Sequence, residues 1–161
     1  LLPTGCGGAP EEFRPRDPAP LVVLSPRTHA VLVAAATRLL GPKAEALIVS
    51  GKVDVGRAVD GILQRMPALA GPLVQGLWVL ELGVFPLLGK VRPFTTLSPE
   101  GRDAILDELM RSRLELKRTL FKGIRSLALL SFYGTEEGRA LTGAPGPFGN
   151  DHVGISDAMR D

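Results

Sequence analysis

Apolar residues recur along much of this chain at the three- and four-residue spacing of an α-helix. The first such segment begins at Ser25-Pro26, where the serine can accept hydrogen bonds from free backbone N–H groups and proline suits the first helical position. Gly41-Pro42 predicts its end. The pattern predicts a helix over 25–40 whose apolar face comprises Val31, Leu32, Ala35, Ala36, Leu39 and Leu40.

Two further helices are predicted before residue 90. Asp54 can cap a helix over 54–66, which Pro67 ends. The segment 72–85 is apolar on nearly all sides, which indicates a helix central to the core with Trp78 as its largest packing group. The surrounding run 66–89 carries Glu81, three prolines and four glycines, so it is a poor membrane span and favours a broken, buried helix pair.

The longest predicted helix covers 99–133. Ser98-Pro99 repeats the start signal, and after the first turn no helix breaker follows before Gly123, although the helix can bend near Ser112 or Gly123. A short helix over 135–141 follows, and a glycine- and proline-rich segment ends the fold. Helix-forming residues dominate, whereas aromatic and β-branched residues are sparse. The prediction is an all-α protein, a compact bundle of about five helices with an extended N-terminal leader and an irregular C-terminal tail.

The side chains of the long helix sort into three stripes when each residue turns by about 100°. The stripe expected to face the core comprises Ile105, Leu109, Leu116, Leu120 and Leu127. A second apolar stripe comprises Met110, Leu114, Phe121 and Ala128. A basic stripe on the side opposite the core comprises Arg111, Arg118, Lys122 and Arg125.

Three interpretations of these stripes remain open. In the first, the helix is central, both apolar stripes are core, and the basic stripe is merely solvated. In the second, the aromatic and basic residues form a protein-docking face, because protein interfaces are enriched in arginine and aromatic side chains. In the third, the arginines bind nucleic acid, which Glu108, Glu115 and the weak net charge disfavour. The docking interpretation predicts partner contacts at Arg111, Arg118, Phe121, Lys122 and Arg125, with a neighbouring region at Phe132, Tyr133 and Phe148.

The N-terminal segment has the composition of a tether. Residues 1–20 hold five of the fourteen prolines, and Phe13 is the one side chain there that is expected to anchor them. The first residues read as the end of an export signal, and Cys6 lies among small residues as at a lipoprotein processing site. Cys6 is therefore either lipidated or a free or partner-bonded thiol. The predicted organisation is a flexible leader over 1–20, a helical domain over 21–148 and a polar tail over 149–161.

Composition narrows the classes of function. A net charge of +2 is too small to require a nucleic-acid or membrane partner. One cysteine excludes an internal disulfide, and with two histidines it leaves a metal site poorly supplied. Phosphate-binding glycine motifs and serine-nucleophile motifs are absent. His29 is expected as a capping or partly buried histidine, and Asp103, Asp107 and Glu108 as solvated side chains, so the sequence predicts no catalytic site and no cofactor in this chain.

A pattern of many positions covers 94–147. It comprises Phe94, Leu97-Ser98-Pro99, Arg102, Ser112-Arg113, Leu120-Phe121-Lys122, residues 127–130, Phe132-Tyr133, Gly143 and Pro145-Gly146-Pro147. The pattern resembles the small-subunit family typified by the third subunit of gluconate dehydrogenase. The resemblance is looser over 21–90, and the chain has Ala144 where the family usually has an aromatic residue and lacks the tryptophan that often stands several residues earlier.

The resemblance implies a non-catalytic subunit that supports the folding or export of an FAD-dependent oxidoreductase of the glucose–methanol–choline class. FAD would belong to that partner, and the hetero-oligomer would be exported, often by the twin-arginine route, to the periplasm or the membrane surface. The resemblance leaves open whether a cytochrome joins the complex, and membrane contact would come only through a lipid anchor or the complex. The alternative is a stand-alone exported helical lipoprotein that binds an apolar small molecule between Trp78, Phe85, Phe132 and Tyr133.

Overall fold

The computed structural model describes residues 10–82 and 92–143. Within these ranges the chain forms helices and no strand, which confirms the predicted all-α class, with more helices than the five expected. The predictions for Cys6, Phe85, Phe148 and the tail over 149–161 lie outside the described residues. The elements are η1 (Glu11–Phe13), α1 (Pro26–Leu39), α2 (Pro42–Val49), α3 (Val55–Arg65), α4 (Pro67–Leu82), η2 (Phe94–Thr96), α6 (Pro99–Arg111), α7 (Glu115–Tyr133) and α8 (Glu136–Thr142).

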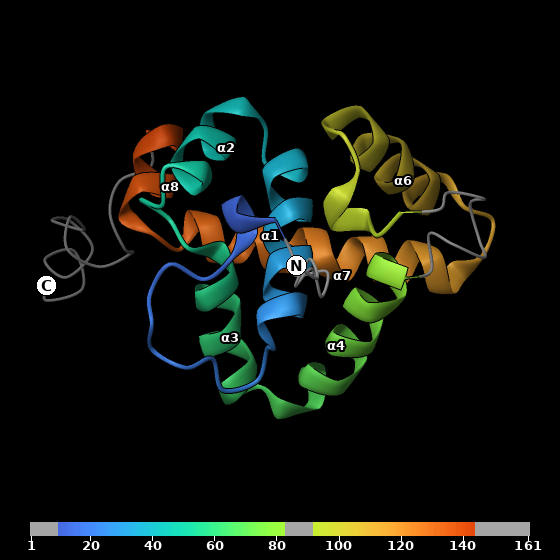
Figure 1. Cartoon of the computed structure of the whole chain (residues 1–161), viewed down its shortest axis with the longest axis horizontal. Coiled ribbons are helices and arrows are strands. Elements are labelled where there is room, and N and C mark those ends of the chain that lie inside the picture. The colour runs from blue at the N-terminus through green and yellow to red at the C-terminus, as the bar shows by residue number, and fades with distance from the viewer. Residues whose placement is uncertain (1–9, 83–91, 144–161) are drawn as a thin grey trace, which may run out of the picture.

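Helix α1 lies at the centre of the bundle, and α7 crosses behind it along the length of the molecule (Figure 1). Every residue from 28 to 37 is buried, and α2, α3, α4, α6 and α7 all pack against this helix. Its buried stretch is rich in alanine. Small side chains let the axes of neighbouring helices come close, which explains how one helix is covered on all sides.

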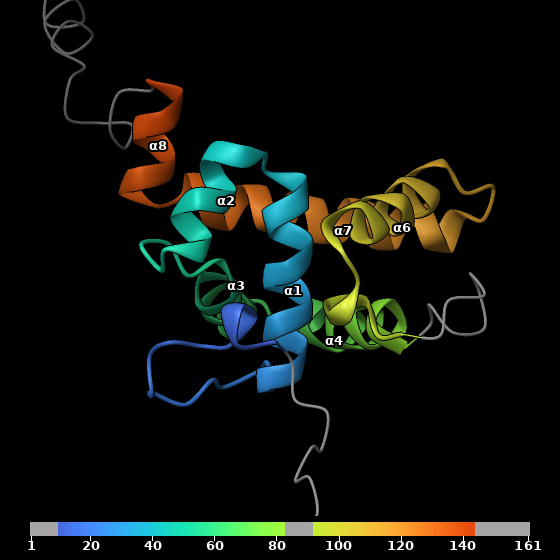
Figure 2. The same ribbon diagram turned by 45° about the horizontal axis from the view of Figure 1, so that its top comes forward.

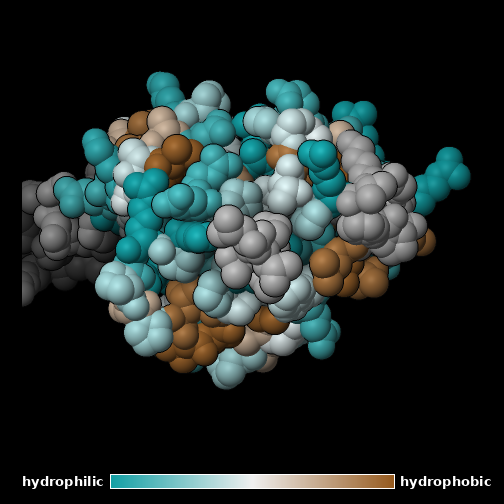
Figure 3. All heavy atoms as spheres, in the orientation of Figure 1, coloured by the Kyte–Doolittle hydropathy of each residue, from teal (hydrophilic) through white to brown (hydrophobic). Residues whose placement is uncertain are grey.

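Helix α4, which was expected at the centre of the core, lies at the edge of the bundle. It starts at Pro67 rather than at residue 72, and it buries only one side, formed by Leu73, Leu77, Leu80 and Glu81. Trp78, Val79 and Leu82 are exposed, and Figure 3 shows apolar surface where this helix ends. The prediction was wrong because a nearly uniform apolar sequence does not say which side of a helix is covered.

The helix starts follow local capping chemistry. Ser25 and Thr28 form a capping box, in which each side chain accepts a hydrogen bond from the other residue's backbone N–H. Asp54 accepts from Arg57 N at 2.9 Å, and Ser98 accepts from Gly101 N at 3.2 Å. These three predicted starts are confirmed. Pro42 and Pro67 were interpreted only as helix ends, but they also begin α2 and α4.

Helices α6 and α7 form a hairpin where the sequence predicted one helix over 99–133. Ser112 leaves helical geometry, with φ −58° and ψ 142°, and α7 folds back against α6 (Figures 1 and 2). Arg118 Nη1 donates to Ser112 O at 2.7 Å and to Arg113 O at 2.9 Å, so it satisfies carbonyls that the turn leaves free. Lys117 and Glu108 pair across the hairpin at 3.1 Å.

This reversal changes which residues of α7 face the core. Leu116 was expected in the core, but it is 81% exposed. Helical phase does not continue through a turn, so the stripes extrapolated from α6 are displaced around α7. The described core side of α7 comprises Phe121, Ile124, Ala128, Ser131 and Phe132, with Leu120 and Leu127 partly buried beside it.

Residues 10–24, named here the strap, pack against α1 and α3 (Figure 2). Phe13 is buried, as its predicted anchoring role requires. Arg16 donates to Ser50 O at 2.8 Å, and Arg57 donates to Ala19 O at 2.8 Å. The prediction of a flexible leader is therefore wrong for residues 10–20, because charged side chains hold the strap's backbone in place.

Asp60 fastens the end of the strap. Its carboxylate is buried and accepts hydrogen bonds from three successive backbone N–H groups, those of Val22 at 3.0 Å, Val23 at 2.9 Å and Leu24 at 2.7 Å. Burial alone would raise the pKa of Asp60, but these hydrogen bonds to the ionised form outweigh it and lower the pKa below its ordinary value. The strap is thus joined to α3 by a carboxylate that must stay charged.

Glu81 makes a second buried connection. Its side chain is 0% exposed and lies 2.6 Å from Arg27 Nη2. Thr95 also donates to it, from the backbone at 3.0 Å and from the hydroxyl at 2.8 Å. The carboxylate therefore links the start of α1, the end of α4 and η2.

Replacing Glu81 with glutamine should lower the free energy of unfolding by about 2 kcal/mol, because one of the two acceptor oxygens becomes a donor that faces donors. Urea unfolding of the wild type and the variant measures this change. Glu137→Gln, at an exposed site of α8, is the matched control and should change stability by less than about 0.5 kcal/mol. Equal stability of the two variants would contradict the linking role.

Candidate functional site

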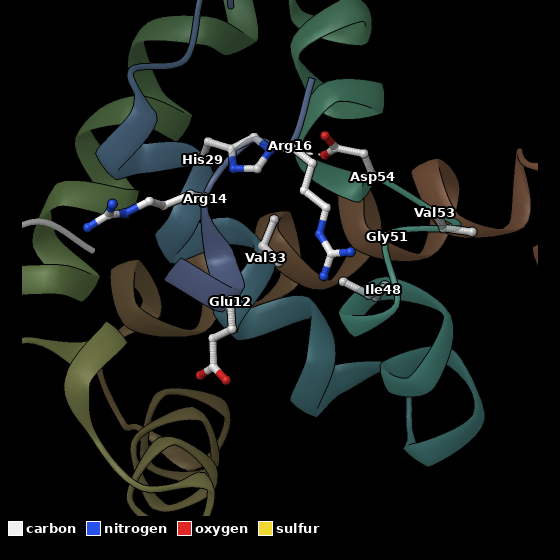
Figure 4. Close-up of a pocket in the computed structure, with 9 residues that line it drawn as sticks. All are labelled: Glu12, Arg14, Arg16, His29, Val33, Ile48, Gly51, Val53 and Asp54. Carbon is white, nitrogen blue, oxygen red and sulfur yellow. Dashed lines mark hydrogen bonds and ion pairs between the residues drawn. The ribbon is translucent and has the colours of Figure 1, made fainter. Parts of the chain in front are cut away.

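His29 and Asp54 form the pair that most resembles catalytic machinery, and Figure 4 shows how they lie. His29 Nε2 is 2.9 Å from Asp54 Oδ1, and Nδ1 is 3.2 Å from Phe13 O. Both neighbours are hydrogen-bond acceptors, so each ring nitrogen lies against an acceptor of this chain. His29 was expected as a capping or partly buried histidine, and the structure buries it almost completely, at 1% exposed.

The hollow beside this pair is small. Its volume is about 30 Å³, enough for a water molecule, and it is lined in part by Arg16, Val53 and Ile48 (Figure 4). Gly56 lies so close to the ring that an added Cβ would be 2.2 Å from His29 Cδ2. The histidine thus joins the strap to the start of α3.

Asp54 takes part in both the helix cap and the histidine contact. Burial raises its pKa, but the hydrogen bonds from His29 and from the backbone of Arg57 act in the opposite direction, and their combined effect lowers the pKa below the ordinary value. Asp54 is therefore ionised at neutral pH. Its contacts to the backbone of Arg57 and to His29 account for its position.

Arg102 packs over the ring of Phe13, the buried residue that anchors the strap. The residue is 6% exposed, and its guanidinium carbon lies 4.8 Å from the centre of the Phe13 ring. Burial lowers the pKa of this arginine. Within residues 10–82 and 92–143, Nε and Nη1 have no hydrogen-bond partner, so the aromatic face is the contact that the structure gives this charge.

The basic residues predicted as partner contacts fall into two groups. Arg111 pairs with Asp107 of its own helix at 2.9 Å, and Arg118 hydrogen-bonds in the hairpin turn. Lys122 and Arg125 are exposed on α7, and neither has an ion pair or hydrogen bond with another described residue. Only the second group offers charges that the described fold does not already use.

The aromatic residues predicted as partner contacts also divide. Phe121 is 8% exposed and Phe132 is buried completely. Both rings pack in the chain's own core, which corrects the expectation that they face a partner. Tyr133 is 37% exposed and touches Phe132 edge to face, with 5.2 Å between ring centres. Among the described aromatic residues that were predicted as partner contacts, Tyr133 is therefore the exposed one.

The outer face of α7 is the largest difference from the sequence prediction. A row of uncharged side chains runs along α7 on the side turned away from the core. Viewed down the helix axis, these side chains fall within an arc of about 80°. The row spans about 20 Å of helix, and its ends are Leu116, at 81% exposed, and Leu130, at 60%. We define the outer face as the exposed residues Leu116, Thr119, Gly123, Ser126 and Leu130. Taking the phase from Phe121, Ile124 and Ala128 alone would have predicted it.

An open groove lies on the other flank of α7, where it meets α1 and α6. Its volume is about 620 Å³. Leu39, Leu106 and Phe121 supply apolar lining, and Met110 and Arg125 also border it. Arg125 therefore belongs to this groove, and the basic edge of α7 separates the groove from the outer face.

The pocket required by the lipoprotein alternative is not formed by the described residues. An added Cβ at Gly76 would lie 2.3 Å from Leu120, so α4 crosses α7 at that point. Phe132 follows Leu120 on α7 by about 18 Å of helix, given the rise of about 1.5 Å per residue. Trp78 of α4 is therefore far from Phe132 and Tyr133.

Among residues 10–82 and 92–143, no cluster of His, Cys, Asp and Glu has the size needed to hold a metal ion. The helices described for this chain lack the combination of length and apolar character that a bilayer crossing needs. Comparisons with protein-family models, with curated proteins and with solved structures give no match.

Proposed function

We propose that this chain is a non-catalytic small subunit that packs on an exported FAD-dependent oxidoreductase of the glucose–methanol–choline class and supports its folding or export. The observation that carries the proposal is the outer face of α7, where Leu116 and Leu130 stand exposed at the two ends of an uncharged row. Exposed apolar surface of this kind is typical of protein contact sites.

The shape of this face favours a protein partner over a small molecule. Small-molecule sites are concave and bury most of their ligand, whereas one side of a single helix is convex. The middle of the face consists of Thr119, Gly123 and Ser126. Short side chains between two leucines allow another chain to lie close against α7, and Tyr133 extends the same side by one turn.

The chemistry of the described residues also supports a role without catalysis. In the His29–Asp54 pair, each ring nitrogen of the histidine lies against an acceptor of this chain. The resemblance to the gluconate dehydrogenase small-subunit family rests mainly on residues of α6 and α7, the helices that form the hairpin. Flavin and redox chemistry would then reside in the partner, in the periplasm or at the membrane surface.

The direct test is co-expression with the product of the neighbouring reading frame, which the proposal expects to be an FAD-dependent oxidoreductase. We expect the two chains to purify together with a flavin absorbance that belongs to the larger one. The small chain purified alone should show neither flavin nor dehydrogenase activity. A stoichiometric flavin on the isolated small chain, or two chains that never associate, would contradict the proposal.

Gly123→Arg separates docking from folding. An added Cβ at Gly123 meets nothing within 4 Å, and arginine favours a helix over glycine by up to about 1 kcal/mol, so the small chain should keep or gain stability. A long charged side chain in the middle of the outer face should weaken the complex about 100-fold, a change measurable by titration calorimetry.

Gly61→Arg is the matched control, because Gly61 lies on α3 and its added Cβ also meets nothing within 4 Å. It should leave the affinity within about twofold of the wild type, which is the usual size of effect at an uninvolved surface site. Equal affinities for the two arginine variants would place the interface elsewhere.

A further inference from the structure

The groove beside α7 has an apolar lining with unequal charge around it. Leu39, Leu106 and Phe121 contribute the apolar part. Met110, at 43% exposed, extends it toward solvent. A volume of about 620 Å³ is several times that of one large side chain, so the groove has room for a protruding side chain and its neighbours.

The acidic residues of the groove already have partners. Arg38 donates to Asp103 from Nε and Nη2, both at 2.8 Å, and it also contacts Glu45 at 3.2 Å. The hydrogen bond from Arg38, with its positive charge, lowers the pKa of Asp103 in spite of partial burial. Asp107 pairs with Arg111. Both carboxylates that line the groove are thus neutralised.

The remaining charge is positive. Arg125 borders the groove and has no ion pair with another described residue, and Lys122 is exposed one turn earlier on the same helix. An occupant that matches this groove places an apolar side chain on the lining and a carboxylate beside Arg125. Neutral or cationic segments would leave the arginine without a partner.

We infer that the groove is a second docking point for the same flavoprotein subunit, and that it receives a bulky apolar side chain with an adjacent aspartate or glutamate. This inference rests on the proposed function, because the partner that covers the outer face must pass the Lys122–Arg125 edge to reach the groove. The partner would then contact α7 on two sides, at the outer face and at the groove.

The test uses the complex obtained by co-expression, with methionine methyl groups labelled with ¹³C. Met110 borders the groove, whereas Met66 is exposed at the junction of α3 and α4 and serves as an internal control. We expect the Met110 methyl resonance to shift on complex formation and the Met66 resonance to stay. Arg125→Glu should weaken the complex more than tenfold, with a loss that shrinks as salt is added.

Arg65→Glu is the matched charge reversal, since Arg65 is exposed at the end of α3; it should change the affinity by less than twofold. Arg125→Lys, which keeps the charge, should retain most of the binding. A complex that forms with an unchanged Met110 signal and equal effects of the two reversals would overturn this inference and leave the proposed function standing. If the wild-type chains do not associate at all, both this inference and the proposed function are wrong.

Discussion

Replacing Asp60 with alanine is expected to lower the free energy of unfolding by about 4 kcal/mol. The substitution removes the acceptor of three backbone N–H groups at the end of the strap. A hydrogen bond to a charged group contributes about 1.5–3 kcal/mol, and the buried donors left behind add a penalty, while partial access to water reduces the sum. Urea unfolding measures the loss, and amide exchange at Val23 and Leu24 should speed up in the same variant.

The contribution of Asp60 to the free energy of unfolding should decrease as the pH falls. Its pKa is lower in the folded state than in the unfolded chain, so its contribution is complete above the unfolded value of about 3.9 and is lost as the pH falls toward the folded value. Asp60→Asn cannot titrate. The stability gap between the wild type and this variant should therefore narrow on acidification; a gap that stays constant down to acid unfolding would contradict the assignment.

Gly56→Ala is expected to destabilise the chain by about 3 kcal/mol. The new methyl group would lie 2.2 Å from His29 Cδ2 and 2.3 Å from Nε2. The ring cannot move aside without losing its contacts to Asp54 and to the Phe13 carbonyl. Overpacking in a well-packed core typically costs about 1–3 kcal/mol, and the lost hydrogen bonds place this case at the upper end.

A double-mutant cycle isolates the cause. In a His29→Ala background the clash is gone, so Gly56→Ala should become neutral or stabilising by up to about 1 kcal/mol, the helix preference of alanine over glycine. Gly61→Ala, on the same helix with open space around it, should stabilise the wild type by a similar amount. Additive effects of the substitutions at residues 29 and 56 would show that the ring is not what excludes a side chain at residue 56.

The parts of the fold that were predicted from sequence depend on local chemistry. Ser25, Asp54 and Ser98 cap helices through side chains that reach only three residues along the chain, so a short sequence window contains the whole cause. For Pro42 and Pro67, the prediction included only part of their local chemistry. Proline ends the preceding helix and also suits the first position of the next, and only the first property was used.

The sequence allowed a bend near Ser112, but the full reversal there could not be predicted in this way. No glycine or proline lies between Arg111 and Glu115, and the turn is held by contacts that exist only after α7 has folded back, such as the Lys117–Glu108 pair. Every stripe that depended on a continuous helix was displaced with it. The buried Phe121 and the exposed Leu116 are the direct result, and for this reason the interface that we propose lies on the outer face and not on the predicted aromatic side.

The strap shows a further limit of sequence reasoning. Its proline content correctly excludes long helices, but disorder does not follow, because the groups that hold it come from elsewhere in the chain. Asp60 reaches Leu24 across a separation of 36 residues. The composition of residues 10–24 includes the prolines of the strap but not Asp60, whose carboxylate binds the strap's backbone.

These long-range contacts also determine when the strap can be secured. A ribosome makes Phe13 early, but Arg102, which covers its ring, belongs to α6 and follows on the order of ten seconds later at ordinary rates of synthesis. During that interval the site of the ring lacks the Arg102 contact. The Phe13 ring therefore reaches its complete set of contacts only after α6 has been translated.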